Sequence, residues 1–273
     1  MLQKKQHHIT NLFESFYLEA YKLSVSNPEK IKILYQNTLA SLSILMPLST
    51  TYSPDFDQTK IPPKFITIAN YFKSICIANI DNESVLNALS IDKSTLPHHG
   101  IDPSPIRHYS VIHSLKKFDI NHHIISGKMH ESLDNIFKPL GSIMISGSNS
   151  KGNYETLKME SEHIASGKSS ITMFPEGANT ERNPLQNEHL VLPFKTGFAV
   201  LAIDLSLPIL PISVAFDPQT DTFKTYVHSF YYPKDLQGLE PQVIAQQMRE
   251  LVIDGIKKVH SSAILTLPHF QEN

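Results

Sequence analysis

Apolar positions recur at intervals of three and four residues over the first 48 residues, which predicts two amphipathic helices. Because apolar stripes usually pack into a core, a helical hairpin that covers the main domain is favoured. Lysines flank both stripes, at Lys4, Lys5, Lys22, Lys30 and Lys32, so the alternative is a platform that lies on a membrane surface. The stripes consist of Ile9, Leu12, Phe13, Phe16, Tyr17, Ala20 and Leu23, then Ile31, Leu34, Tyr35, Leu39, Leu42 and Leu45.

Short apolar runs alternate with helical patterns further along the chain. Residues 49–64 are polar and contain proline, so we expect a linker, and the apolar run 72–80 predicts a strand. Three prolines and a glycine predict a loop at 91–105. From about residue 106 the pattern predicts strands at 122–126, 142–145, 170–174, 208–216 and 223–231, and helices at 154–165, 194–205 and 244–259.

Strands that alternate with helices of this length predict an α/β fold with a mixed central sheet flanked by helices. We expect residues 1–64 to form an N-terminal helical segment with its linker. Residues 65–273 would then form the α/β domain.

Composition excludes several classes of protein. The chain has 273 residues, of which 41% are apolar and 18% charged, and this excludes global disorder. A net charge of −2 argues against a protein built mainly to hold nucleic acid. The single cysteine, Cys76, cannot form an internal disulfide, which fits a reducing compartment. No stretch resembles a signal peptide or a spanning helix, so we expect a cytoplasmic protein, soluble or peripheral at the inner face of a membrane.

The most informative segment is an apolar strand that ends at Pro175-Glu176-Gly177. Ligands of open α/β sheets bind at the carboxyl ends of strands. Pro175 would stop the strand and Gly177 would let backbone approach a ligand closely. The alternative is an ordinary surface turn, because proline and glycine are common turn residues.

His108 is a candidate general base, because it lies where a loop is expected to enter a helix. A helix N-terminus disfavours the imidazolium form, so a histidine there stays neutral and can accept a proton. In a chain with 14 histidines, a structural or surface role is the alternative.

Five blocks between about 105 and 260 together resemble the glycerolipid acyltransferase family, which contains the lysophosphatidic acid acyltransferases. Arg107-His108-x-Ser110-x-x-His113 is similar to the family's N-H-x-S-x-x-D, and Lys128 follows His108 by 20 residues, near the family spacing. The other blocks are Gly141-Ser-Ile-Met-Ile145-Ser-Gly147, Phe174-Pro-Glu-Gly-Ala-Asn-Thr180, Leu192-Pro-Phe-Lys-Thr-Gly197 and Leu207-Pro-Ile-Leu-Pro-Ile-Ser213.

The resemblance implies transfer of a fatty acyl group from acyl-CoA or acyl-carrier protein to a hydroxyl of a lysolipid-like acceptor. His108 would be the base and His113 its partner, and Glu176 would position the acceptor. Substrate contacts would come from Ser110, Lys128, Pro175, Gly177, Asn179 and Lys195. The implied partners are the acyl donor and a membrane lipid surface, with no nucleic acid and no cofactor. With one cysteine and no H-E-x-x-H motif, we also expect no metal site.

The chain departs from the family pattern at three charged positions. His113 stands where the family has aspartate, so it can orient His108 by a hydrogen bond but cannot supply a negative charge. Gly147 and Asn179 replace the two family arginines that hold phosphate. Phosphate contacts would then fall to Lys128, Lys151, Arg182 or Lys195, or the acceptor carries no phosphate. These departures leave a catalytically impaired lipid-binding relative, or a hydrolase of acyl thioesters or lysolipids, as alternatives.

Overall fold

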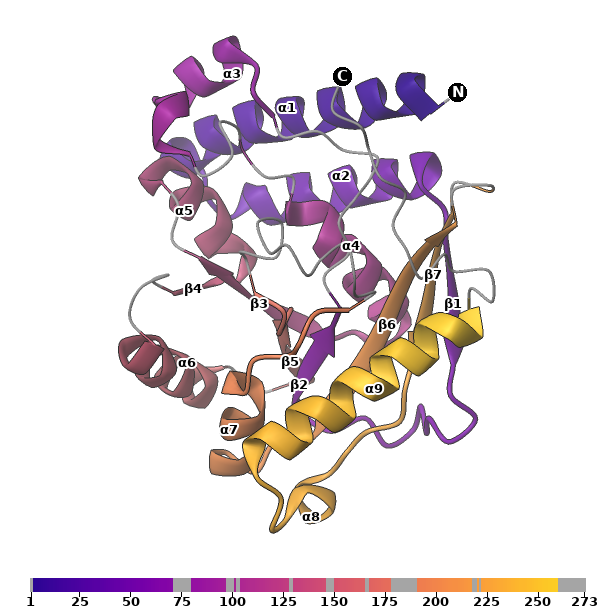
Figure 1. The fold of residues 1–273 in the computed structure, drawn as a ribbon. Coiled ribbons are helices and arrows are strands. Elements are labelled where there is room, and N and C mark those ends of the chain that lie inside the picture. Colours follow the sequence, from indigo (N-terminus) through magenta and orange to yellow (C-terminus); the bar gives the residue numbers. More distant parts are fainter. Residues whose placement is uncertain are drawn as a thin grey trace. The chain divides into compact units, whose positions relative to one another are not determined.

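The computed structural model describes residues 2–70, 80–96, 101, 104–127, 130–145, 150–164, 167–177, 191–217, 220 and 222–259 (Figure 1). The chain divides into two compact units. The first unit comprises Met1–Pro47, Ser74–Tyr109 and His123–Ser150. The second comprises Leu48–Lys73, Ser110–His122 and Lys151–Asn273.

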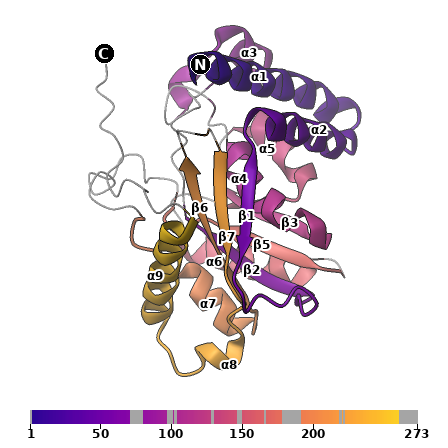
Figure 2. The same ribbon diagram turned by 90° about the vertical axis from the view of Figure 1, so that its right-hand side faces the viewer.

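The first unit is built around the N-terminal helical hairpin. Its α1 and α2 lie side by side in both Figure 1 and Figure 2, and α1 also contacts α5. The rings of Tyr17 and Phe137 meet edge to face, with centroids 6.2 Å apart. The unit also holds the short strand β4, which pairs in parallel with β3. The bounds are α1 (Leu2–Ser26), α2 (Lys30–Leu45), α3 (Glu83–Ala88), α5 (Glu131–Phe137), β3 (Asn121–Gly127) and β4 (Ile143–Ile145).

The two apolar stripes predicted for this hairpin are largely buried. Four of their side chains are 0% exposed: Phe13, Tyr17, Ile31 and Leu42. The hairpin therefore packs its stripes into a core, and its predicted position over the main domain stays a prediction. Val25, Ile33 and Ile44 are exposed, and the membrane-surface interpretation stays a prediction.

The second unit contains a mixed sheet with the strand order β1-β7-β6-β2-β5, and the first residues of β3 follow β5. Strand β2 lies between β6 and β5 and is parallel to both, and β1 is parallel to β7. Only the β6–β7 pair among these is antiparallel. The strands are β1 (Leu48–Tyr52), β2 (Lys64–Ala69), β5 (Ser169–Met173), β6 (Ile209–Asp217) and β7 (Thr222–Val227).

Burial explains why the central strands read as continuous apolar runs. Every residue of β5 is buried, and so is every residue of β2 after Lys64, as expected for parallel strands that are covered on both faces. Asn70, which follows β2, extends the pairing with its side chain. Its amide accepts from the N–H of Val214 at 2.7 Å and donates to the carbonyl of Val214 at 3.0 Å.

Helices cover the sheet of the second unit. The long helix α9 packs on β6 and β7 and contacts α7 (Figure 1). It buries one apolar stripe that includes Ile244, Met248, Val252 and Ile256. The helices are α6 (Ser150–His163), α7 (Gly197–Asp204), α8 (Pro233–Leu236) and α9 (Pro241–Val259), and α4 (Ser104–Leu115) begins in the first unit and ends in the second.

A buried polar cluster joins α9 to the sheet. Ser213 on β6 donates from its hydroxyl to the carbonyl of Val252 at 2.8 Å. The same hydroxyl oxygen lies 2.9 Å from Nε2 of His228, so it accepts a hydrogen bond from the Nε2–H tautomer of that ring. His228 is 5% exposed and its ring packs edge to face on Tyr226.

Burial at this cluster makes stability depend on pH. Desolvation, reinforced by the charge of Lys258 and opposed by Asp254, lowers the pKa of His228 to about 4. The unfolded chain binds this proton near pH 6.5, so the stabilising effect of the neutral ring is complete above that pH and is lost as pH falls toward 4. We expect His228 alone to cost about 2 kcal/mol of unfolding free energy between pH 7 and pH 5.

Urea unfolding of the wild type and of His228→Gln at both pH values measures this effect. The other titrating groups are shared, so the wild type should lose more stability than the variant on acidification. Equal losses in the two proteins would contradict the assignment.

The predicted fold class is confirmed: the protein is α/β, with a mixed sheet and flanking helices. The strands predicted after residue 106 all form, but the one predicted at 223–231 ends at Val227, and α7 begins at Gly197 rather than at 194. Two predictions fail, since residues 48–52 form β1 instead of a linker, and β2 at 64–69 was not expected. The strand predicted at 72–80 lies outside the described residues except for Ile80. The domain boundary predicted between residues 64 and 65 stays a prediction.

Candidate functional site

The turn at Pro175–Gly177 follows directly from β5 and lies in the second unit. The N–H of Gly177 donates to the carbonyl of Phe174 at 3.0 Å, which closes a tight turn. Gly177 has a φ of +88°, a conformation that favours glycine. Pro175 and Glu176 are both buried. The structure therefore has a firmly built turn where the sequence placed a candidate site.

Lys195 lies against this turn. Its backbone N–H donates to the carbonyl of Pro175 at 2.9 Å. Its side chain covers Gly177 so closely that a Cβ atom there would lie 2.5 Å from Nζ and 2.9 Å from Cε. The side chain of Lys195 is exposed, so this ammonium presents a positive charge to solvent beside the turn.

Glu176 holds the neighbouring backbone. Its side chain is 8% exposed, and Oε2 accepts a hydrogen bond from the N–H of Leu192 at 2.7 Å. A backbone N–H that donates to a carboxylate makes one of the stronger hydrogen bonds in proteins. Glu176 therefore anchors the segment that leads to Lys195.

Arg249, on α9, is a residue of this region that the sequence did not single out. Its guanidinium donates from Nε and Nη2 to the carbonyl of Val191, and from Nε also to the carbonyl of Leu192. The only signal in the sequence is its position beside Met248, at the edge of the apolar stripe of α9. A long cationic side chain there can reach past the buried face of its helix.

His108 is the fifth residue of α4 and is 6% exposed. The sequence predicted that His108 lies where a loop enters the helix. This prediction is wrong, because the helix already begins at Ser104. Because the effect of the helix dipole fades beyond the first turn, that argument for a neutral imidazole weakens. Ser110, also a predicted substrate contact, is buried at 3% exposure.

His113 lies later on the same helix and is half-buried. Burial, followed by the positive charge of Lys116, lowers the pKa of His113, so the ring is neutral at pH 7. Residues five apart on a regular α-helix lie about 140° apart around its axis, so helical periodicity alone does not bring His113 to His108.

The remaining predicted residues differ in how far the structure describes them. Lys128 and Asn179 lie outside the described residues, as do Gly147 and Arg182. Lys151 is exposed at the start of α6. His108 belongs to the first unit and Glu176 to the second, so the expectation that they face one cleft stays a prediction.

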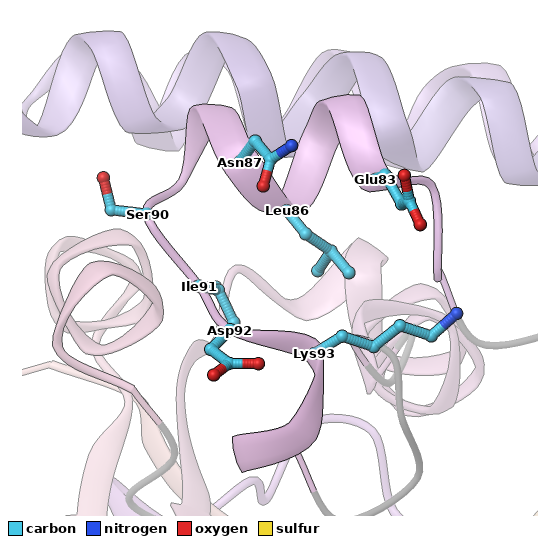
Figure 3. A pocket seen from close by; sticks show the side chains of 7 residues that line it. All are labelled: Glu83, Leu86, Asn87, Ser90, Ile91, Asp92 and Lys93. Carbon is cyan, nitrogen blue, oxygen red and sulfur yellow. The ribbon is translucent and has the colours of Figure 1, made fainter.

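A surface pocket of about 470 Å³ lies in the first unit and contains none of the predicted residues. Figure 3 shows that α3 and the segment that follows it line this pocket. The carboxylate of Asp92 there already accepts from the N–H and the hydroxyl of Ser94, at 2.9 and 2.8 Å. The lining residues are Glu83, Leu86, Asn87, Ser90, Ile91, Asp92 and Lys93.

The described ranges contain neither a candidate metal cluster nor a membrane-spanning helix. In those ranges, no three histidine, cysteine, aspartate or glutamate side chains gather closely enough to hold a metal ion. No helix within the same ranges has the length and apolar character needed to cross a bilayer.

The chain matches a family model and resembles a solved structure. No curated protein matches the sequence. The chain is similar to the crystal structure of the 1-acyl-sn-glycerophosphate (LPA) acyltransferase, PlsC, from Thermotoga maritima, with a TM-score of 0.48 and 14% sequence identity. That alignment covers 96% of this chain and 98% of the other. Residues 111–215 match the family described as Acyltransferase. This range contains Glu176, Gly177 and Lys195 and begins three residues after His108. Over residues 111–215, therefore, the chain is similar to the acyltransferase family.

Proposed function

We propose that the protein transfers a fatty acyl group from the thioester of acyl-CoA or acyl-carrier protein to a hydroxyl of a lysolipid-like acceptor. The observation that carries the proposal is the turn Pro175–Gly177 with Lys195 against it, inside the segment that matches the acyltransferase family. The turn follows a buried strand of an α/β sheet, where such folds bind their ligands.

The chemistry requires a base, because a hydroxyl is a poor nucleophile at neutral pH. In the proposed reaction, His108 takes the hydroxyl proton as the oxygen attacks the thioester carbonyl. A carbon–oxygen bond forms, the carbon–sulfur bond breaks, and the imidazolium returns the proton to the departing sulfur. His113, neutral at pH 7, can orient another group by a hydrogen bond but adds no negative charge to stabilise the imidazolium.

Lys195 and the turn are the proposed acceptor contacts. An exposed ammonium beside a backbone turn suits an anionic group on the acceptor, such as a phosphate. Pro175, Gly177 and Ser110 remain proposed substrate contacts, and Glu176 is proposed to position the acceptor through the backbone that it holds. Such an acceptor is a membrane component, so we propose peripheral binding to a lipid surface on the cytoplasmic side and a role in lipid synthesis.

An assay with radiolabelled acyl donor tests this function. Purified protein is incubated with acyl-CoA or acyl-carrier protein and with matched lysolipids that carry or lack a phosphate. We expect label in the lipid product, and faster transfer to the phosphate-bearing acceptors. Label that appears only as free fatty acid would identify a hydrolase instead.

A third outcome separates binding from catalysis. If no label moves, titration calorimetry with the same acyl donor shows whether the protein still binds it. Binding without turnover would overturn the enzymatic proposal and identify a lipid-binding relative, for which the loss of the family aspartate at His113 is the specific reason.

A further inference from the structure

Arg249 commits its guanidinium to two backbone carbonyls that lie far away in the sequence. Nε lies 3.0 Å from the carbonyl oxygen of Val191 and 3.1 Å from that of Leu192. Nη2 lies 2.6 Å from the oxygen of Val191. Within the part of the chain that the structure describes, Arg249 forms no ion pair. Its charged guanidinium therefore strengthens the hydrogen bonds to these two carbonyls.

The peptide groups of Leu192 are thus held by two charged side chains of opposite sign. Glu176 accepts from the N–H at 2.7 Å, and Arg249 donates to the carbonyl. Val191 and Leu192 are buried, at 0% and 3% exposure, so water is poorly placed to replace either partner. A buried polar group that loses its hydrogen-bond partner destabilises the folded state, because its desolvation is no longer offset.

The same short segment leads directly to the candidate site. Lys195 follows Leu192 by three residues, and its N–H is bonded to the carbonyl of Pro175. Its side chain lies over Gly177. A shift of the backbone at Val191 and Leu192 would therefore displace both the carboxylate of Glu176 and the ammonium of Lys195.

The geometry points to Arg249 as a positioning residue of the candidate site: its two donors fix the backbone of Val191 and Leu192, and so aim Glu176 and Lys195 for the acceptor. This inference rests on the proposed function, to which it adds a residue from the C-terminal helix. The planar fork of arginine reaches two carbonyls at once, whereas lysine carries a single ammonium on a flexible stem. Lysine at this position should therefore replace only part of the effect.

Arg249→Met is the test, with Lys257→Met as its matched control on the same helix. Lys257 is exposed and pairs with Asp254 on the surface of α9. We expect Arg249→Met to raise the KM for the acceptor about tenfold while the KM for the acyl donor changes less than about twofold, because the lost contacts hold the acceptor side of the site. Arg249→Lys should recover part of the loss, and Lys257→Met should behave as wild type.

Hydrogen exchange gives a readout that does not depend on activity. The amide of Leu192 should exchange about ten times faster in Arg249→Met than in wild type, since local opening sets this rate. Unchanged exchange at Leu192 would overturn the inference, whatever the kinetics. A lower melting temperature with equal changes in both KM values would also overturn it, because that pattern fits a general structural role.

The two proposals can fail separately. If the wild type transfers no acyl group, the proposed function fails, and with it the part of the inference that concerns the acceptor. Faster exchange at Leu192 in Arg249→Met would then still establish the hold on this backbone. If wild-type transfer is normal and the acceptor KM of Arg249→Met is unchanged, only the inference fails.

Discussion

Replacing His108 by alanine is expected to lower kcat/KM for acyl transfer by at least about 100-fold. The proposed imidazole is the group that takes the proton from the attacking hydroxyl, and methyl cannot do so. General bases contribute about 10²- to 10⁴-fold to the rates of enzymes that use them. The loss should lie toward the lower end, because His113 supplies none of the negative charge that a family aspartate would provide. Steady-state kinetics with the radiolabelled donor measure it.

Burial makes controls necessary for this variant. His108 is 6% exposed, so alanine also removes buried volume and can destabilise the fold. His108→Gln keeps most of the volume and removes the base, so it should lose activity to a similar degree while its melting temperature stays near that of wild type. His8→Ala removes an exposed imidazole from α1 and should leave transfer unchanged. Full activity in His108→Gln would exclude His108 as the base.

The sequence predicted an element well where apolar residues formed a clear run or recurred at a clear helical spacing. The late strands are short apolar runs, and α9 repeats apolar positions at helical spacing over 19 residues, so their existence was clear. Strand β1 was missed because its sequence, Leu48-Ser-Thr-Thr-Tyr52, is mostly polar. It forms a strand because it pairs with β7. Strand β2 is apolar, but it directly follows two prolines. Because prolines are typical of linkers, the predicted linker was extended to the first residue of β2. Strand partners that lie more than 100 residues later in the sequence leave no local signal.

The sequence predicted the part of the candidate site whose residues are adjacent in the chain. Pro175, Glu176 and Gly177 are adjacent, and turn chemistry identified them. Lys195 entered through the family resemblance, and the structure does bring it to Gly177. Arg249 could not be found in this way, because it contacts a backbone 57 residues earlier through a helix packed on the sheet. Backbone carbonyls carry no mark in a sequence, so a residue that binds them cannot be predicted from residue types.

Gly255 is the position on α9 where the smallest substitution should be most damaging. Alanine there is expected to lower the unfolding free energy by about 3 kcal/mol. Its Cβ would lie 2.5 Å from Nε2 of His228 and 2.8 Å from Cβ of Ser213, and it would overlap Oγ of Ser213. On an exposed helix the same change would be favourable by about 1 kcal/mol, because alanine is the better helix former. The direction of the effect therefore tests whether packing or helix propensity decides.

Ser213 cannot easily move aside, and this is why the clash should outweigh propensity. Its hydroxyl is bonded both to His228 and to the carbonyl of Val252, at 2.9 and 2.8 Å. Relief would break these bonds or lift α9 from β6. Urea unfolding of Gly255→Ala measures the loss, and Gly197→Ala is the control, because a Cβ at Gly197 meets nothing within 4 Å. Combining Gly255→Ala with Ser213→Ala removes the most crowded atom, so the pair should be more stable than the sum of the two single losses predicts. Strict additivity, or a Gly255→Ala variant as stable as wild type, would mean that α9 does not rest on the sheet through this contact.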